Sequence, residues 1–255
     1  MLKKLKIGKG IKAAVVVALM LTLISFSSRM EKGEVCNSIV VKLANQHDNF
    51  FIDENDITNM MTKGGDEVLV GAYFKDVNLK IIEGRVQAEP FIKSAEIYKD
   101  LKGNLLVNAE LRRPFARIME PGKANGYVAL DGTILPTSYK YTSRAVILSG
   151  DYMVGMIKRA DLHQNETDQQ LFDMLHYIYN DKFWKAQVAQ IDIDKNGYVK
   201  IYPQVTKQVV EFGSLEDMET KFKKLKVFYK QVLPQKGWNT YSRINLEYKD
   251  QIVAE

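Results

Sequence analysis

The feature that most constrains this chain is an uncharged segment near its amino terminus, where 14 residues from Ala13 to Phe26 carry no charge. Five lysines precede it, and no acidic residue occurs before Glu31. A cleaved secretory signal has a basic start, an apolar stretch of about 7–15 residues and a small-residue site, which Ser25-Phe26-Ser27 could supply. An uncleaved anchor needs about 20 residues, and Ile11 to Ser28 supplies 18. Length alone leaves both interpretations open.

Both interpretations place the rest of the chain outside the cytoplasm, because positive charge before a span stays on the cytoplasmic side. If the segment is retained, residues 1–12 form a basic cytoplasmic tail and residues 13–28 a single-pass transmembrane anchor. The chain would then contact the lipid bilayer through this anchor.

The basic character of the chain also belongs to this tail. The isoelectric point is about 9.0, but without the five lysines 31 basic residues face 31 acidic ones. A neutral body lacks the positive charge that phosphate binding requires. The sequence therefore predicts no nucleic-acid partner.

Residues typical of metal or catalytic sites are few and scattered. Cys36 is the sole cysteine, which leaves an unpaired thiol in a linker or an intermolecular bridge. The run from Asp192 to Gly197 opens like a calcium loop, but its twelfth position is Pro203, which cannot supply the bidentate carboxylate. The isolated histidines are His47, His163 and His176. We expect no metal, no cofactor and no enzymatic activity.

Hydropathy patterns predict an α+β unit from about residue 38 to residue 112. A β-branched run over 38–43 indicates a strand. Asp53 and Asp56 form a capping-box pattern before one helix, and a second helix begins near Asp76. Alternating apolar residues over 92–98 and 105–111 indicate two further strands. The predicted order is β-α-α-β-β.

The remaining residues predict a mixed, mainly antiparallel sheet with packed helices. Asp131-Gly132 and Asn196-Gly197 indicate tight hairpins, the first with a type I′ turn. Further strands are expected over 144–149, 209–212 and 243–253, and helices are expected to begin at Thr167 and at Ser214. In the second helix the lysines from 221 to 226 are expected on a solvated face, and Pro234 is expected to end it.

Four segments of this layout resemble the FtsQ/DivIB family of bacterial cell-division proteins. Pro90–Ile97 is similar to the family's run into the second strand of its POTRA domain, and Leu105–Ala116 to the strand that follows. Tyr127–Gly150 and Ile244–Val253 resemble two segments of its β-domain. Asn245 and Glu247 stand where the family usually has Asp and Arg, so charge pairing specific to that strand is not carried over.

The resemblance implies an uncleaved anchor, a POTRA domain over 38–113 and a β-domain over 114–255. It also implies a non-enzymatic divisome scaffold in the inner membrane at the division site, with the body in the periplasm. The implied partners are FtsB- and FtsL-like membrane coiled-coil proteins, and through them the septal peptidoglycan synthase complex. The alternatives are a POTRA-type periplasmic chaperone or adaptor, and an exported envelope enzyme.

An edge strand near the carboxyl end of the sequence is the expected partner-binding element, because unpaired strand edges accept an incoming strand. Alternation over 244–249 predicts one face packed on the domain and one face outward. The candidate binding residues are Ile244, Leu246, Glu247, Tyr248, Lys249 and Asp250.

Overall fold

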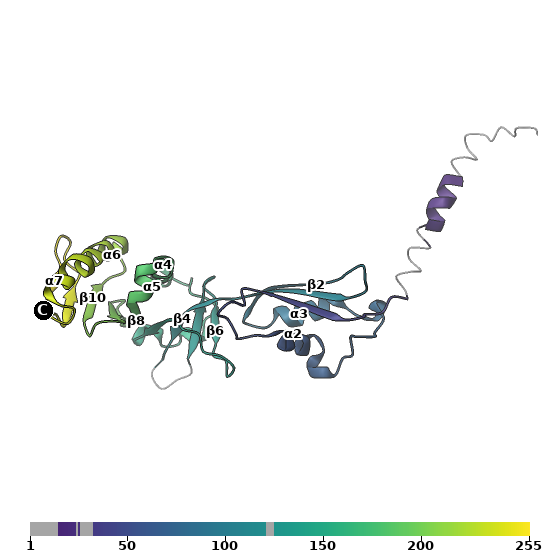
Figure 1. The fold of residues 1–255 in the computed structure, drawn as a ribbon, viewed down its shortest axis with the longest axis horizontal. Coiled ribbons are helices and arrows are strands. Elements are labelled where there is room, and N and C mark those ends of the chain that lie inside the picture. The colour runs from purple at the N-terminus through teal and green to yellow at the C-terminus, as the bar shows by residue number, and fades with distance from the viewer. Residues whose placement is uncertain (1–14, 24, 26–32, 121–124) are drawn as a thin grey trace, which may run out of the picture. The chain divides into compact units, whose positions relative to one another are not determined.

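The computed structural model separates the chain into two compact units (Figure 1). Unit 1 comprises residues 1–44 and 52–110, and unit 2 comprises residues 45–51 and 111–255. The described residues are 15–23, 25, 33–120 and 125–255. The expected tail and part of the expected anchor lie outside them. Among the described residues, no helix combines the length and apolar character needed to cross a bilayer.

Unit 1 is a three-stranded sheet with two helices. Its strand β1 (Ile39–Ala44) pairs in parallel with β3 (Leu105–Leu111), which lies between β1 and β2 (Ile92–Lys99). The helices α2 (Glu54–Met61) and α3 (Leu79–Gln87) follow β1 in the sequence. This order confirms the predicted β-α-α-β-β arrangement.

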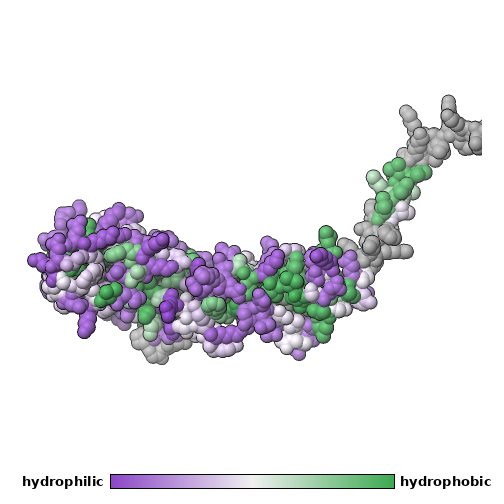
Figure 2. Space-filling model, viewed as in Figure 1, coloured by the Kyte–Doolittle hydropathy of each residue, from purple (hydrophilic) through white to green (hydrophobic). Residues whose placement is uncertain are grey.

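The core of unit 1 follows from the periodicity of its apolar residues. Buried side chains recur four apart in the two helices and two apart in β3, so each element turns one face inward. The core residues include Ile57, Met61, Ile82, Val86, Leu105 and Val107. Apolar residues are also visible on the surface of unit 1 in Figure 2, and Val68, Val70 and Ile81 are among those at least half exposed.

The helix starts of unit 1 agree with the sequence at one position and differ at the other. Asp53 and Asp56 exchange two backbone-to-carboxylate hydrogen bonds of 2.9 Å, which confirms the capping box of α2. The second helix begins after Asn78 and not near Asp76, because Asn78 Oδ1 accepts a bond from Ile81 N at 3.2 Å. Residues 74–76 form a separate 3-10 turn.

Cys36 is a free thiol, as one of the two expectations had it, but it is packed into unit 1 and does not lie in a linker. Its side chain is 1% exposed, and its backbone bonds to Ala72 O at 2.9 Å and to Gly71 N at 2.7 Å. Burial raises the pKa of the thiol. A buried, protonated thiol is a poor nucleophile, so the structure argues against an intermolecular bridge through this residue.

Unit 2 is built on a nine-stranded mixed sheet in the order β12-β11-β10-β9-β8-β7-β4-β5-β6. Neighbours are parallel in the pairs β4–β7, β7–β8 and β10–β11. The strands are β4 (Pro114–Ile118), β5 (Gly126–Ala129), β6 (Ile134–Pro136), β7 (Val146–Ser149), β8 (Val188–Ile193), β9 (Val199–Pro203), β10 (Val209–Gly213), β11 (Arg243–Asn245) and β12 (Val253–Ala254).

The helices of unit 2 pack on this sheet through an aromatic core. Trp184 and Phe212 both contact Phe222, with ring centroids 4.8 and 5.0 Å away. The helices are α4 (Glu166–Asn180), α5 (Lys182–Gln187), α6 (Met218–Val227) and α7 (Leu233–Lys236), drawn on one side of the sheet in Figure 1. The mixed sheet with packed helices agrees with the predicted α+β class.

Both predicted hairpins form, but the expected type I′ turn at Asp131 is wrong. That turn needs positive φ at both central residues, and among the described non-glycine residues Asp131 is not one of those with positive φ. Gly132 N instead bonds to Ala129 O at 2.8 Å, and Gly132 alone takes the positive φ of 83°. This geometry is a type I turn followed by a glycine bulge.

Three helix predictions in unit 2 also need correction. The helix expected from Thr167 begins at Glu166, because Asn165 Oδ1 accepts a bond from Asp168 N at 2.8 Å. The helix expected from Ser214 begins at Met218. Pro234 does not end the helical segment: a π-helix over Phe228–Val232 joins α6 to α7, and Pro234 lies in the first turn of α7, which continues to Lys236.

Lys221 departs from the expected solvated face of the lysine run. It is 8% exposed, its Nζ donates to Ser214 O at 2.7 Å, and it lies 5.2 Å from the centroid of the Phe212 ring. Burial lowers the pKa of this lysine. The residue therefore ties the start of α6 to the sheet.

Candidate partner-binding site

Of the six predicted binding residues, only Ile244 lies within strand β11, and Leu246 follows it with its N–H bonded to Glu211 O. Strand β11 pairs in parallel with β10, with Val210 opposite Ile244, and antiparallel with β12, with Ile244 opposite Ala254. β11 is therefore an inner strand, and β12 is the edge. The single strand expected over 243–253 is therefore two strands, and only its end, in β12, lies at the edge of the sheet.

The predicted alternation holds for the first half of the segment. Ile244 and Leu246 are completely buried and pack into the core of unit 2. Arg243 is exposed and Asn245 is half-buried, on the opposite face of the strand. This arrangement leaves a polar outer face on β11.

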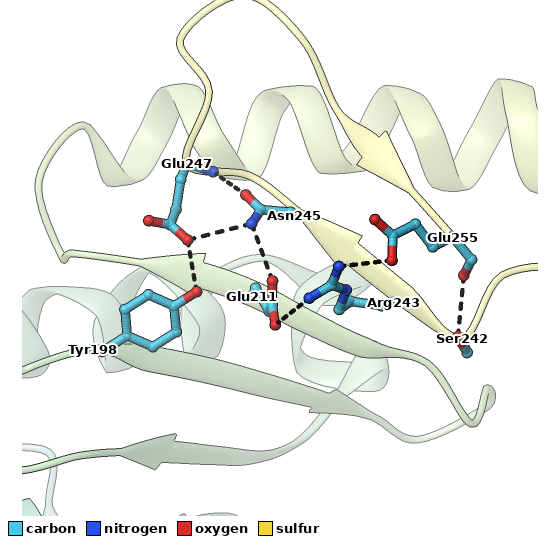
Figure 3. Close-up of polar contacts among 7 residues, drawn as sticks. All are labelled: Tyr198, Glu211, Ser242, Arg243, Asn245, Glu247 and Glu255. Carbon is cyan, nitrogen blue, oxygen red and sulfur yellow. Dashed lines mark hydrogen bonds and ion pairs between the residues drawn. The ribbon is translucent and has the colours of Figure 1, made fainter.

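Glu211 of β10 organises this outer face (Figure 3). Its carboxylate accepts a hydrogen bond from Asn245 Nδ2 at 3.0 Å and pairs with Arg243 Nη1 at 3.4 Å. Arg243 Nη2 also donates to the Glu255 carboxylate at 2.6 Å. The Glu255 carboxylate first, and the charge of Glu211 next, raise the pKa of the Arg243 guanidinium. These side chains thus link β10 and β11 to the residue that follows β12.

Glu247 extends the network at its other end. Its carboxylate accepts hydrogen bonds from Tyr198 Oη at 2.7 Å and from Asn245 Nδ2 at 3.3 Å. Burial, followed by the bond to this carboxylate, raises the pKa of the Tyr198 hydroxyl, so Tyr198 stays a neutral donor. The exposed carboxylate of Glu247 therefore forms hydrogen bonds within unit 2.

The second half of the predicted strand is wrong. Glu247 N bonds to Asn245 Oδ1 at 2.8 Å, which turns the backbone out of the sheet. Lys224 Nζ then donates to the carbonyls of Tyr248 and Lys249 at 2.7 and 3.1 Å. Tyr248, Lys249 and Asp250 consequently lie in an exposed bend, and Tyr248, expected to pack inward, is 51% exposed.

The outward-facing backbone of the edge strand belongs to Ala254. Arg243 and Glu255 exchange two backbone hydrogen bonds of 3.0 Å. In an antiparallel ladder the next residue along each strand turns its N–H and C=O to the other side. The N–H and C=O of Ala254 therefore point away from β11, toward the open edge of the sheet.

Sequence reasoning missed Tyr198, Glu211, Arg243 and Glu255. The signal it lacked is the pairing of β10 with β11, because α6 and α7 separate them in the sequence. Alternation along the segment indicated that one face points outward. It contained no information about which residues of neighbouring strands contact that face.

The other predicted features have structural explanations. The Asp194 carboxylate accepts hydrogen bonds from Asn196 N at 2.8 Å and Tyr198 N at 2.9 Å, so this part of the calcium-like run forms the hairpin turn. His176 contacts Leu130 O at 3.0 Å, and His163 contacts Gln169 Oε1 at 3.1 Å. Within the described ranges, no group of three or more histidine, cysteine or acidic residues could hold a metal ion.

Both parts of the chain match known families. A POTRA-like domain model matches residues 34–110. A model described as FtsQ/DivIB, C-terminal related, matches residues 113–255. No curated protein matches the chain.

The fold and these matches define a protein with a POTRA-like domain followed by an FtsQ/DivIB-related β-domain. The chain belongs to the FtsQ/DivIB family. Membership implies a scaffold role in cell division, and proteins of this family are generally non-enzymatic.

Proposed function

We propose that this protein is a membrane-anchored divisome scaffold that binds FtsB- and FtsL-like coiled-coil proteins. Through them it helps to recruit and regulate the septal peptidoglycan synthase. The observation that carries the binding mode is the open edge at β12, where the outward N–H and C=O of Ala254 are available to an incoming strand.

The network behind β12 supports this assignment. Binding by strand addition requires an edge that keeps its position, because each backbone hydrogen bond depends on register. Arg243 and Ser242 both hold Glu255 at the end of β12, the latter through Ser242 Oγ at 3.2 Å. The edge is thus fixed by side chains before any partner arrives, which lowers the cost of binding.

The proposal is tested with Ala254→Pro in the full-length chain. Proline removes the N–H that faces outward, while the bonds between Arg243 and Glu255 remain. Co-purification with the FtsB-like partner should be lost. Lys249→Pro is the matched control, because Lys249 lies in the exposed bend and its carbonyl contact with Lys224 survives the change.

Circular dichroism and tryptophan fluorescence first establish that both variants fold. A folded Ala254→Pro variant that still binds its partner refutes strand addition at β12. Depletion of the protein should also produce unseptated filaments, whereas normal septation refutes the division role. Turnover of a wall substrate by the purified protein would favour the enzyme alternative.

The proposed location is the inner membrane, with the amino terminus in the cytoplasm and both units in the periplasm. Residues 15–23 are helical, and their large apolar side chains are 53–63% exposed. Figure 2 shows this segment as a run of apolar colour. The lysines before it support the orientation.

A further inference from the structure

A cavity of about 1010 Å³ opens in unit 2 at the amino ends of three neighbouring parallel strands. These strands are β4, β7 and β8, and the sheet order separates them from β12 by β9, β10 and β11. The volume reaches the upper end of the range of about 300–1,000 Å³ typical of ligand pockets. The cavity is therefore large enough for a ligand of several groups.

Four cationic side chains line this cavity. Arg113, Arg144 and Lys185 lie just before β4, β7 and β8, and Arg117 lies within β4. Among the described lining residues the sole acidic one is Asp48, whose carboxylate lies 3.5 Å from His47 Nε2. The cavity thus carries an excess of positive charge in a body whose overall charge is neutral.

Among the described residues, none of these four cationic side chains forms an ion pair with a carboxylate. Arg113 Nη2 donates to the His47 carbonyl at 2.8 Å. The Arg117 guanidinium lies 5.8 Å from the centroid of the Tyr127 ring, and Lys185 Nζ lies 4.1 Å from that of Tyr179.

Arg117 gives the clearest sign of an unmet contact. Its Nε is buried and has no hydrogen-bond partner among the described residues. A buried donor without an acceptor is unfavourable, and native proteins seldom leave one. An anionic oxygen entering the cavity would meet an arginine whose Nε has no hydrogen-bond acceptor among the described residues.

The floor of the cavity is apolar and indicates the chemistry of the rest of the ligand. Met119, Val146 and Ile147 line it; Met119 is 39% exposed and the two β7 residues are half-buried, so their apolar surface is open to a ligand. A small inorganic anion would leave this floor uncovered, and a hydroxyl-rich glycan would find few partners there. A peptide that carries both carboxylates and apolar side chains satisfies both parts of the cavity.

We propose that this cavity binds an acidic, partly apolar segment of a partner protein. Its carboxylates pair with Arg117, Arg144 and Lys185. Its apolar side chains lie on Met119 and Val146. The site is distinct from the strand-addition edge at β12, so the scaffold carries two binding sites on one domain.

The test uses the full-length chain in detergent and a phage-displayed library of random dodecapeptides. Peptides are selected on the wild-type protein and counter-selected on the double variant Arg117→Gln, Arg144→Gln. The selected sequences should be rich in Asp and Glu, with interspersed apolar residues. In fluorescence anisotropy, each single variant should bind a selected peptide about tenfold more weakly, and the wild-type affinity should fall with added salt.

Matched controls separate this site from general charge and from the edge at β12. Lys207→Gln removes an exposed lysine outside the cavity and should leave the affinity unchanged. Ala254→Pro should also leave it unchanged, so failure of the β12 proposal and failure of this one are distinguishable. Arg144→Glu should bind a peptide whose glutamates are replaced by lysines better than the wild type does.

Three results would overturn the proposal. In the first, no selected peptide prefers the wild type to the double variant. In the second, the selected peptides lack acidic residues. In the third, the folded Arg144→Gln variant binds a selected peptide as tightly as the wild type does. Because Arg144 is exposed, its substitution keeps the test valid even if Arg117→Gln fails to fold. Binding of purified glycan strands that depends on the same arginines, without peptide binding, would assign the cavity to a glycan and refute the peptide.

Discussion

At the residue scale, Asn245 shows how one amide group joins two carboxylates and a backbone N–H on the outer face of β11. Its Nδ2 donates to Glu211 at 3.0 Å and to Glu247 at 3.3 Å, while its Oδ1 accepts from Glu247 N. The amide lies between two carboxylates, so an aspartate at this position would bring three carboxylates together. Asparagine in place of the family's usual aspartate at position 245 is thus consistent with the two neighbouring carboxylates, Glu211 and Glu247.

Asn245→Asp should therefore destabilise unit 2 by about 1–3 kcal/mol, because it removes a donor and adds a like charge. The loss should shrink in mildly acidic solution, since crowding raises carboxyl pKa values and protonation relieves the repulsion. Urea unfolding followed by the fluorescence of Trp184 and Trp238 measures it. Asn239→Asp, at an exposed position, is the control. Equal stability of the two variants would contradict the role of Asn245.

Lys221 shows what sequence periodicity misses at this scale. A run of lysines late in a helix indicates a solvated face, but Lys221 is positioned by the carbonyl of Ser214 and the ring of Phe212. Both partners come from before α6. A pattern counted along one helix contains no information about such contacts.

At the scale of elements, Arg85 links the two helices of unit 1. From α3 it donates to Met61 O at the end of α2 at 3.0 Å, and it pairs with Glu67 at 2.6 Å. The hydrogen bond to Arg85 first, and that to Lys63 next, lower the pKa of Glu67 from 4.5 to about 2.

This shift predicts an acid-sensitive link in unit 1. Because the folded pKa lies below the unfolded one, the stabilising effect is present above pH 4.5 and is lost as pH falls toward 2. Glu67→Gln should remove this pH dependence from the hydrogen exchange of the α2 amides. Asp66→Asn, at the exposed neighbouring position, should retain it. A Glu67→Gln variant with the wild-type pH profile would show that the pair does not stabilise the helices.

Elements whose signals are local could be predicted, and those set by distant contacts could not. The capping box of α2 and the alternation in β3 are local, and both are confirmed. The hairpin at Gly132 was located correctly, but its turn type depends on the backbone of the preceding residues. The strand expected over 243–253 breaks because Lys224, from α6, takes up two of its carbonyls.

At the scale of the whole molecule, the chain combines a POTRA-like unit with an FtsQ/DivIB-related unit. The hydropathy patterns of the sequence predicted the element order of the first and the mixed sheet of the second. The order of elements placed the POTRA-like part, since its β-α-α-β-β sequence is contiguous apart from connecting loops. The edge at β12 and the cationic cavity arise only when strands distant in sequence become neighbours. The sequence therefore placed the candidate partner-binding site in the carboxyl-terminal region, which contains the edge of the sheet at β12. It did not show which strand forms the edge of the sheet or which side chains from β10 support it.

At the scale of the whole molecule, alkaline extraction tests directly whether the apolar segment is retained. We expect alkaline extraction to leave the full-length protein in the membrane pellet, because about 18–20 apolar residues suffice for a span. The double variant Val17→Arg, Leu19→Arg should move into the supernatant, since each arginine at the centre of a span costs about 2.5–3.5 kcal/mol.

Val205→Arg, an exposed change within unit 2, is the matched control for added charge and should leave the protein in the pellet. Mass spectrometry of the extracted chain completes the test, because anchoring and cleavage differ in the first residue of the mature protein. A soluble mature chain that begins near Ser28 would identify a cleaved signal and would refute the anchor. An intact chain starting at Met1 in the pellet, with the arginine variant released, would establish that residues 13–28 hold this scaffold in the membrane.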